Sequence, residues 1–224
     1  EDVNIMSRVC TGDGIDIVGC EDVTLRNSFI RASDDCVCIK AASYPDPAAN
    51  RDVKNILVEH CVLWNAEPGN AVEIGYEVRC DEISDITFRD LDIVHCQYEG
   101  NQSGGVLTIH NADRAYIHNI VYEDICVEDA QEKFIDIKVL DSKYSLDRSR
   151  GRVEDIFFRN IEILNGNFPV SIIRGFEMHT EMSRPQNIHF DNVVVLGEQI
   201  NSPSDLHMVV ELSNDIWFNG KVHV

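Results

Sequence analysis

A short pattern of alternating apolar and polar residues recurs along the chain. It takes the form of nine-residue phrases that open on Asn or Asp and are apolar at their second and fourth positions, as at Ile86 and Phe88. Alternation with a period of two is typical of a strand with one buried face. Each phrase therefore predicts a strand. The phrases are DVNIMSRVC (2–10), DVTLRNSFI (22–30), NILVEHCVL (55–63), DITFRDLDI (85–93), NIVYEDICV (119–127), DIFFRNIEI (155–163), NIHFDNVVV (187–195) and, more loosely, DIWFNGKVH (215–223).

A second alternating segment follows six of these phrases, and helical periodicity is not evident anywhere. The phrases start 20 to 36 residues apart. Repeats of this kind cannot each bury a core alone, but they do so when they stack. We therefore predict an all-β fold, a right-handed parallel β-helix (β-solenoid) of about eight coils. The second segments are GIDIV (14–18), CVCIK (36–40), AVEIG (71–75), VLTIH (106–110), FIDIK (134–138) and PVSII (169–173).

The sixth position of the phrase is mostly Asn or Asp. These residues favour bends between strands, and they could form a hydrogen-bonded ladder from coil to coil. We expect a structural role for them. They are Asn27, Asp90, Asp124, Asn160 and Asn192.

The chain begins and stops inside a repeat. An uncapped end coil exposes apolar side chains and unpaired strand edges. We therefore expect residues 1–224 to be a single β-helix domain and a fragment of a longer protein that lacks its N-terminal coils and cap.

The composition and net charge limit the classes of partner that we expect. Among 224 residues, 44% are hydrophobic, which favours a packed fold, and the formal net charge is −20. That charge repels phosphate, so we expect neither nucleic acid nor a membrane as a partner. No apolar run approaches the roughly 20 residues of a membrane span, and no segment resembles a signal peptide. The eight cysteines and eight histidines show no metal-ligand spacing, so no metal or cofactor is expected.

The second segments predict a polar stripe on one face of the solenoid. We align them on one inward-facing isoleucine each, so that the residues before and after it point away from the core. The inward row is Ile17, Ile39, Ile74, Ile109, Ile137 and Ile172. The outward rows are Asp16, Cys38, Glu73, Thr108, Asp136 and Ser171, and then Val18, Lys40, Gly75, His110, Lys138 and Ile173.

Three aspartates lie just before the first two of these segments: Asp13 in TGDGID, and Asp34 and Asp35 in SDDCVCIK. Coils stack about 4.8 Å apart, so the three carboxyl groups would lie close enough to separate their pKa values. A glycosidase needs such carboxyl groups as acid and base. Two other interpretations stay open, an Asp-rich turn that ends a strand and a pair of calcium ligands.

These residues carry a family resemblance. TGDGID, followed by DDCVCIK with Asp34 21 positions after Asp13, resembles the NTDG(F/I)D and (G)DDC(I/L)A(I/V)K motifs of glycoside hydrolase family 28. That family includes polygalacturonases and rhamnogalacturonan hydrolases with a right-handed parallel β-helix. GNAVEIG (69–75) is similar to its GHGxSIG, DIK (136–138) to its RIK, and GRVEDIFFRNI (151–161) to its downstream G-x-V-x-N-I-x-F-x-N-I. The resemblance extends over about residues 1–165.

The resemblance implies a mechanism and a substrate class. Asp34 would be the general acid, and Asp13 and Asp35 would position and deprotonate the attacking water with inversion. The substrate would be a polysaccharide or oligosaccharide, and the protein would be secreted or periplasmic. We expect the substrate to contact Lys138, which matches the Lys of RIK, and Asp136, Asn70, Glu73, Lys40 and His110.

The departures from the family motifs bear on the substrate. Asn70 stands where the family has His, and Asp136 stands where RIK has Arg. Replacing Arg by Asp exchanges a bidentate carboxylate clamp for a like charge. We therefore expect a neutral sugar in the cleaved subsite, or a uronate in a neighbouring subsite served by Lys40 or Lys138. The glycan would be pectin-related or neutral.

Two other function classes stay open. A non-catalytic carbohydrate-binding or adhesion β-helix predicts that the three aspartates lie apart, and a polysaccharide lyase requires cations and typically calcium. Sugars stack on aromatic rings, and four candidates lie in loops around the expected cleft, Tyr44, Trp64, Tyr76 and Tyr98. The longest loops, 44–55 and 140–152, are expected to set selectivity. The oligomeric state is not predicted.

Overall fold

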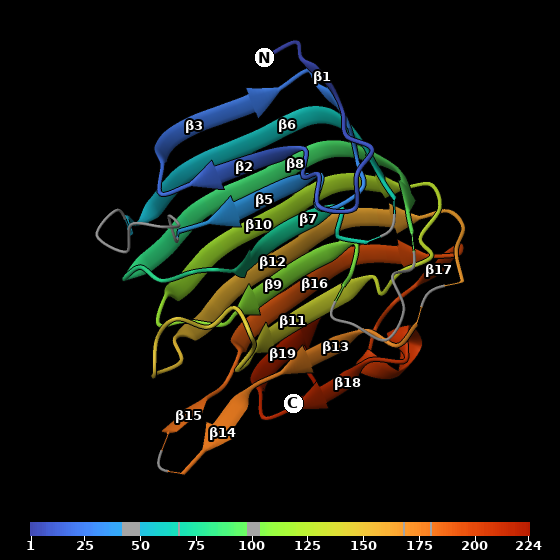
Figure 1. Ribbon diagram of the computed structural model, residues 1–224. Coiled ribbons are helices and arrows are strands. Elements are labelled where there is room, and N and C mark those ends of the chain that lie inside the picture. Colours follow the sequence, from blue (N-terminus) through green and yellow to red (C-terminus); the bar gives the residue numbers. More distant parts are fainter. Residues whose placement is uncertain (42–49, 67, 98–103, 168, 180) are drawn as a thin grey trace.

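The computed structural model describes residues 1–41, 50–66, 68–97, 104–167, 169–179 and 181–224. Within these ranges the regular structure is almost entirely β, and two large sheets lie face to face (Figure 1). The one helical element described is a short 3-10 helix, η2 (Pro203–Leu206). No helix in these ranges is long and apolar enough to cross a lipid bilayer.

The larger sheet contains the repeated phrases. Its strands pair in parallel, except where β17 and β20 add antiparallel edges to β16 and β19. In spatial order it contains β1 (Asn4–Met6), β4 (Phe29–Ala32), β6 (Val53–Asn65), β8 (Glu82–Cys96), β10 (Tyr116–Val127), β12 (Arg152–Ile163), β16 (Gln186–Val195), β19 (Asn214–Phe218) and β20 (Lys221–Val222), with β3 (Glu21–Arg26) on β6 and β17 (Glu198–Gln199) on β16.

The smaller sheet contains the second segments and is parallel throughout. Over most of the chain, from residue 29 to residue 174, successive strands alternate between the two sheets, so the chain winds as a parallel β-helix. In spatial order the strands are β18 (Val209–Glu211), β13 (Ile172–Arg174), β11 (Ile135–Val139), β9 (Leu107–Asn111), β7 (Val72–Tyr76), β5 (Val37–Lys40) and β2 (Ile15–Val18). A separate hairpin pairs β14 (Phe176–Met178) with β15 (Glu181–Ser183).

The predicted solenoid is confirmed. It forms about 5 turns, somewhat fewer than the eight coils counted from the phrases. Near the ends the phrases form the short strands β1, β3, β4 and β19, whereas those between form the long strands β6, β8, β10, β12 and β16.

The core between the sheets contains an aromatic stack. The fourth position of successive phrases supplies Phe88, Tyr122, Phe158, Phe190 and Phe218, all almost fully buried. Adjacent ring centroids lie 4.8 to 5.1 Å apart, with the planes within 11° of parallel. Each ring contributes about 1.5–3 kcal/mol through burial. The stack follows from the repeat, because the same phrase position comes to the same place in every coil.

The Asn and Asp residues of the phrases form the predicted turns. The backbone at Asn27, Asp90, Asp124, Asn160 and Asn192 is left-handed, with φ between 50° and 53° at four of them and 55° at Asp124. Asn and Asp tolerate this conformation better than most residues. The amide of Asn192 donates to Asn160 over 2.9 Å, and that of Asn160 donates to Asp124 over 3.0 Å. The expected ladder is therefore present over these three coils.

The register of the smaller sheet agrees with the sequence alignment through five strands. Asp16, Cys38, Glu73, Thr108 and Asp136 are paired in one column. At the next strand the alignment was wrong by one residue. Asp136 pairs with Ile172, and Ile173 is the buried core residue. Both positions are isoleucine, so alternation alone did not distinguish them.

Candidate active site

Three stacked turns bring the acidic residues together at the start of the smaller sheet. The first contains Asp13, the second Asp34 and Asp35, and the third Gly69 and Asn70. Backbone hydrogen bonds hold them in register, from Gly14 N–H to Asp35 O over 2.8 Å and from Cys36 N–H to Asn70 O over 2.9 Å. A Cβ on Gly69 would lie 2.3 Å from the Asp34 carbonyl carbon, so a glycine is required for this close approach.

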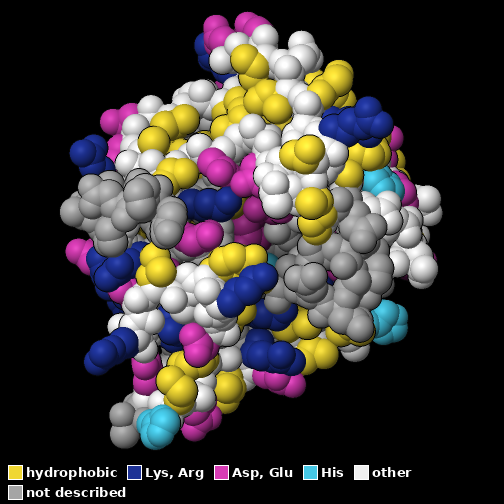
Figure 2. Space-filling model, viewed as in Figure 1, with side chains coloured by type: hydrophobic (Ala, Val, Ile, Leu, Met, Phe, Trp, Pro, Cys, Tyr) yellow, Lys and Arg dark blue, Asp and Glu magenta, His cyan; other side chains and the backbone are white. Residues whose placement is uncertain are grey.

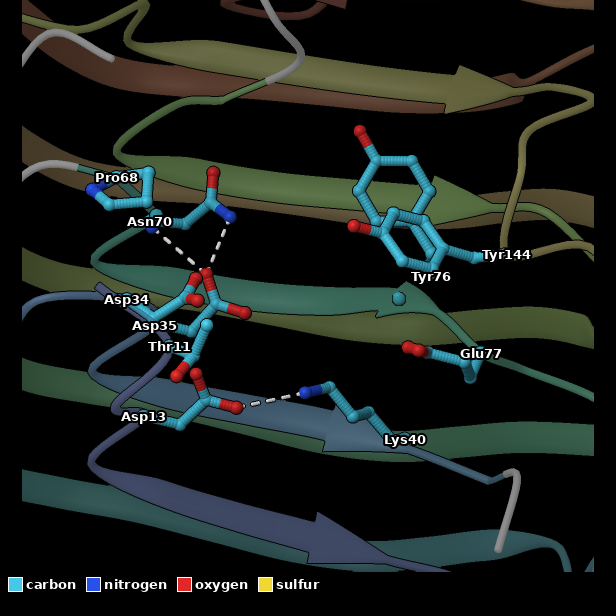
Figure 3. A pocket seen from close by; sticks show the side chains of 12 residues that line it. Thr11, Asp13, Asp34, Asp35, Lys40, Pro68, Asn70, Tyr76, Glu77 and Tyr144 are labelled. Carbon is cyan, nitrogen blue, oxygen red and sulfur yellow. Dashed lines mark hydrogen bonds and ion pairs between the residues drawn. The ribbon is translucent and has the colours of Figure 1, made fainter. Parts of the chain in front are cut away.

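The three aspartates form one cluster on the floor of a cleft. One carboxylate oxygen from each of Asp13, Asp34 and Asp35 lies within 4.8 Å of the others. The cleft has a volume of about 380 Å³, and acidic and lysine side chains are visible in its hollow (Figures 2 and 3). Its lining consists of Thr11, Asp13, Asp34, Asp35, Lys40, Pro68, Gly69, Asn70, Gly75, Tyr76, Glu77 and Tyr144.

Asp35 is the most enclosed of the three, with only 7% of the residue exposed. Its Oδ1 accepts hydrogen bonds from the Asn70 backbone N–H (2.9 Å) and side-chain amide (2.7 Å). The side-chain oxygen of Asn70, Oδ1, in turn accepts from Gly105 N–H over 2.8 Å, which fixes the amide orientation. Burial, together with the charge of Glu73, raises the pKa of Asp35 well above its ordinary value, although the Asn70 hydrogen bond opposes this.

Lys40 supplies positive charge beside this cluster. Its Nζ lies 3.0 Å from Asp13 and 3.4 Å from Asp16. Burial lowers the pKa of Lys40, but Cys38, Asp16 and Asp13 raise it by more, so the net pKa is above the ordinary value. For Asp16 burial dominates, and its pKa is raised despite Lys40. Lys40 is therefore a cation paired with two carboxyl groups of its own chain.

The expected substrate contacts of Glu73, His110, Asp136 and Lys138 are not supported by the geometry. All four point away from the core as predicted, yet all are buried, and the residues that line the described cleft do not include them. The prediction took an outward row to be an exposed row. Of the six substrate-contacting residues that we expected, Lys40 and Asn70 line the cleft.

These buried groups form an ionic network behind the cleft. His110 Nδ1 lies 2.9 Å from Glu73 Oε1, and His110 Nε2 lies 3.5 Å from Asp136 Oδ2. Lys138 Nζ lies 2.9 Å from Asp136. Burial lowers the pKa of His110, but the two carboxylates raise it to about 9. The pKa of Asp136 is lowered, because His110, Lys138 and Lys133 outweigh its burial.

The four aromatic candidates have different outcomes. Tyr76 lines the cleft, as expected of a sugar contact. Trp64 lies outside the lining, with its ring between the Arg31 guanidinium, 4.4 Å from the centroid, and the His95 ring at 5.5 Å. Tyr44 and Tyr98 lie outside the described residues.

Several lining residues were missed from the sequence, among them Thr11, Pro68, Glu77 and Tyr144. Glu77 follows the cleft strand β7, and Tyr144 belongs to the 140–152 loop that we expected to set selectivity. No local signal distinguishes Tyr144 from other loop aromatics, since it reaches the cleft through the path of its loop.

The same cluster bears on metal binding. Asp13, Asp34 and Asp35 each place an oxygen where one cation could contact all three. Carboxylate oxygens are ligands that calcium and magnesium accept. Lys40 already places a positive charge on Asp13, which favours proton chemistry over metal binding at this point.

The comparison with protein families identifies the chain. The sequence model of glycosyl hydrolases family 28 matches residues 3–203. The chain belongs to glycosyl hydrolase family 28. Comparisons with curated proteins and with solved structures gave no match. Membership of the family, together with the parallel β-helix, means that this protein is a polygalacturonase-like glycoside hydrolase acting on polysaccharide.

Proposed function

We propose that this family 28 enzyme cleaves O-glycosidic bonds with inversion, using Asp34 as general acid and Asp13 and Asp35 to hold and deprotonate water. The observation that carries the proposal is the cluster itself, three carboxyl groups within 4.8 Å on the floor of one cleft. A non-catalytic β-helix was expected to have the three aspartates apart. The pairing of Asp13 with Lys40 supports Asp13 as the carboxylate that takes the proton from water.

The raised pKa of Asp35 would also suit a general acid, so burial and access must decide between the neighbours. Asp35 is almost enclosed, and one of its oxygens accepts two hydrogen bonds from Asn70. Asp34 is more exposed and lines the cleft, where a glycosidic oxygen would lie. We therefore assign proton donation to Asp34 and orientation of the water to Asp35.

The stereochemistry of the product tests this mechanism. The three oxygens are closer together than the roughly 6.5–9.5 Å between acid and base in most inverting enzymes, so the water would lie beside the cluster rather than between facing carboxyl groups. Proton NMR of the first-formed reducing end should show the inverted anomer. A retained anomer would refute inversion, and full activity in Asp34→Asn would refute the assigned acid.

We further propose that the sugar in the cleaved subsite is neutral. Among the described residues, the charged ones that line the cleft are four acids and Lys40, and Lys40 is paired with Asp13 and Asp16. Lys138, the other lysine considered for a uronate, pairs with Asp136 on β11 and does not belong to the described lining of the cleft. A uronate carboxylate would therefore meet net negative charge. Release of reducing ends from neutral glycans and from polygalacturonate tests this, and comparable turnover on both would contradict it.

The lyase alternative has its own signature. A lyase would produce an unsaturated product with new ultraviolet absorbance and would lose activity when a chelator removes calcium. We expect reducing ends without that absorbance, and activity that a chelator leaves unchanged. Absorbance that grows with product would replace the hydrolase mechanism with elimination.

A further inference from the structure

Two tyrosines form the side of the cleft across from the aspartates. Tyr76 and Tyr144 both line it, with ring centroids 5.4 Å apart and planes tilted by 49° (Figure 3). Tyr144 is 43% exposed, and the Lys143 Nζ lies 4.8 Å from its ring centroid, so part of its ring surface is open beside that cation. A pyranose ring has an apolar C–H face, and aromatic surface beside a few polar groups is the usual composition of a binding pocket.

Tyr76 is held in place from beneath. Its ring stacks on His110, with centroids 4.6 Å apart and planes within 19° of parallel. His110 is itself fixed between Glu73 and Asp136, the buried network described above. A Cβ on Gly75 would lie 2.4 Å from His110 O, so the glycine permits this close stacking. Burying such charges is costly unless each is paired. The result here is a ring with little freedom to move.

Tyr144 is held by its loop. Buried Asp113 accepts hydrogen bonds from the backbone N–H of Leu146 (2.6 Å) and Asp147 (2.7 Å). The Asp147 carboxylate then lies 3.0 Å from both Arg79 and Arg114. These contacts tie the loop to neighbouring coils, so both tyrosines are positioned before any ligand arrives. Pre-positioned side chains lose less entropy on binding.

We propose that Tyr76 and Tyr144 form an aromatic subsite for a neutral pyranose next to the bond that is cleaved. This rests on the proposed function, because the sugar chain must run from the tyrosines to the aspartates. A neutral ring is favoured over a uronate because Glu77 and the three aspartates share the same cleft. The buried Glu73, His110 and Asp136 then act as positioning residues for Tyr76.

Binding to an inactive variant tests the subsite apart from the chemistry. In the Asp34→Asn background, isothermal calorimetry would measure neutral oligosaccharides from galactan, arabinan and xylan against oligogalacturonate of equal length. We expect Tyr76→Ala and Tyr144→Ala each to weaken binding of the best neutral oligosaccharide about tenfold. Tyr76→Phe keeps the ring and should bind within about twofold of its parent. Tyr116→Ala, on the outer face of β10, is the matched control and should change nothing.

Each outcome has one meaning. Unchanged affinity in both alanine variants, or oligogalacturonate binding as tightly as the neutral panel, would overturn the subsite. Absence of binding by any neutral member would do the same. If the native chain binds these oligosaccharides through the tyrosines but hydrolyses none, the proposed function fails and the subsite stands. Thermal melts of all variants separate lost contacts from lost folding.

Discussion

In the larger sheet, the core residue at the fourth phrase position is similar from one coil to the next. In the smaller sheet, the residue that points away from the core at one register position differs in every coil. The first gives an aromatic stack from Phe88 to Phe218. The second contains Asp16, Cys38, Glu73, Thr108 and Asp136 in one register. Both are built on the same parallel pairing, so the backbone is not the source of the difference.

The contrast teaches where stability and chemistry are located in a repeat protein. Similar side chains that stack from coil to coil can pack against one another or hydrogen-bond to one another. In the larger sheet this gives the aromatic stack and the Asn/Asp turn ladder. A column of different polar residues has to be paired individually, as His110 is with Glu73 and Asp136. The candidate active site lies beside this column, where side chains differ from one coil to the next.

The largest expected effect is a loss of kcat on substitution of an aspartate in the candidate active site. Asp34→Asn should lower kcat by about 10² to 10⁴-fold, the usual contribution of a general acid, with no large change in melting temperature. Asp85→Asn is the matched control, since Asp85 opens a phrase on the repeating sheet. Steady-state kinetics on the same glycan would compare them. An equal loss of kcat in both variants would remove the contrast between the sheets.

A substitution in the aromatic stack of the larger sheet should lower the stability of the protein. Phe158→Ala removes one buried ring from the stack and should lower the free energy of unfolding by about 3–5 kcal/mol. Urea unfolding measures this. The folded fraction should keep its KM, because the stack faces the core. A changed KM at unchanged fold would mean that the two sheets are coupled.

The buried histidine should make stability depend on alkaline pH. Its folded pKa of about 9 lies above the ordinary 6.5, so its contribution is fully present below pH 6.5 and is lost as pH rises through 9. The expected loss is roughly 3 kcal/mol. Unfolding free energies across this range would show the slope, and His110→Gln should flatten it. His60→Gln, a substitution at an exposed site, should leave the slope unchanged. If His110→Gln also leaves the slope unchanged, His110 is not the cause of the pH dependence.

The smallest effect concerns the turn ladder. Asn160 has φ of 51° and bonds both to Asp124 and to Asn192. Asn160→Ala should destabilise by about 1–2 kcal/mol, since alanine is strained in this conformation. Asn160→Gly relieves the strain and should lose only the hydrogen bonds. Thermal unfolding would rank them, and a glycine variant less stable than the alanine variant would contradict a conformational cause.

The fold could be predicted because its causes are local. Alternation at Ile86 and Phe88 predicts a strand, and Asn160 predicts a bend between strands, from the chemistry of a few neighbouring residues. The gathering of Asp13, Asp34 and Asp35 followed from the same stacking. The register at Ile172 and Ile173 was not predictable in this way, because both residues suit the core.

Burial of the outward column depends on contacts distant in the sequence. Alternation correctly placed Glu73 and His110 away from the core, yet Tyr76 stacks over His110. Tyr144 reaches Tyr76 from a loop more than sixty residues further along the chain. No pattern within one repeat specifies which segment packs against it. Lining residues such as Tyr144 and Glu77 therefore needed the structure.

The phrases start at intervals of 20 to 36 residues, although the long strands that contain most of them, β6, β8, β10, β12 and β16, are neighbours in one sheet. The additional residues are therefore absorbed in the connections, and coil spacing is set by the backbone pairing alone. The length of a connection can therefore vary without a change in the sheets that it joins. We therefore expect the 140–152 loop, which carries Tyr144, to tolerate exchange. Exchanging it for loops of other lengths would vary the aromatic wall of the cleft while the aspartates, on their own stacked turns, stay where they are.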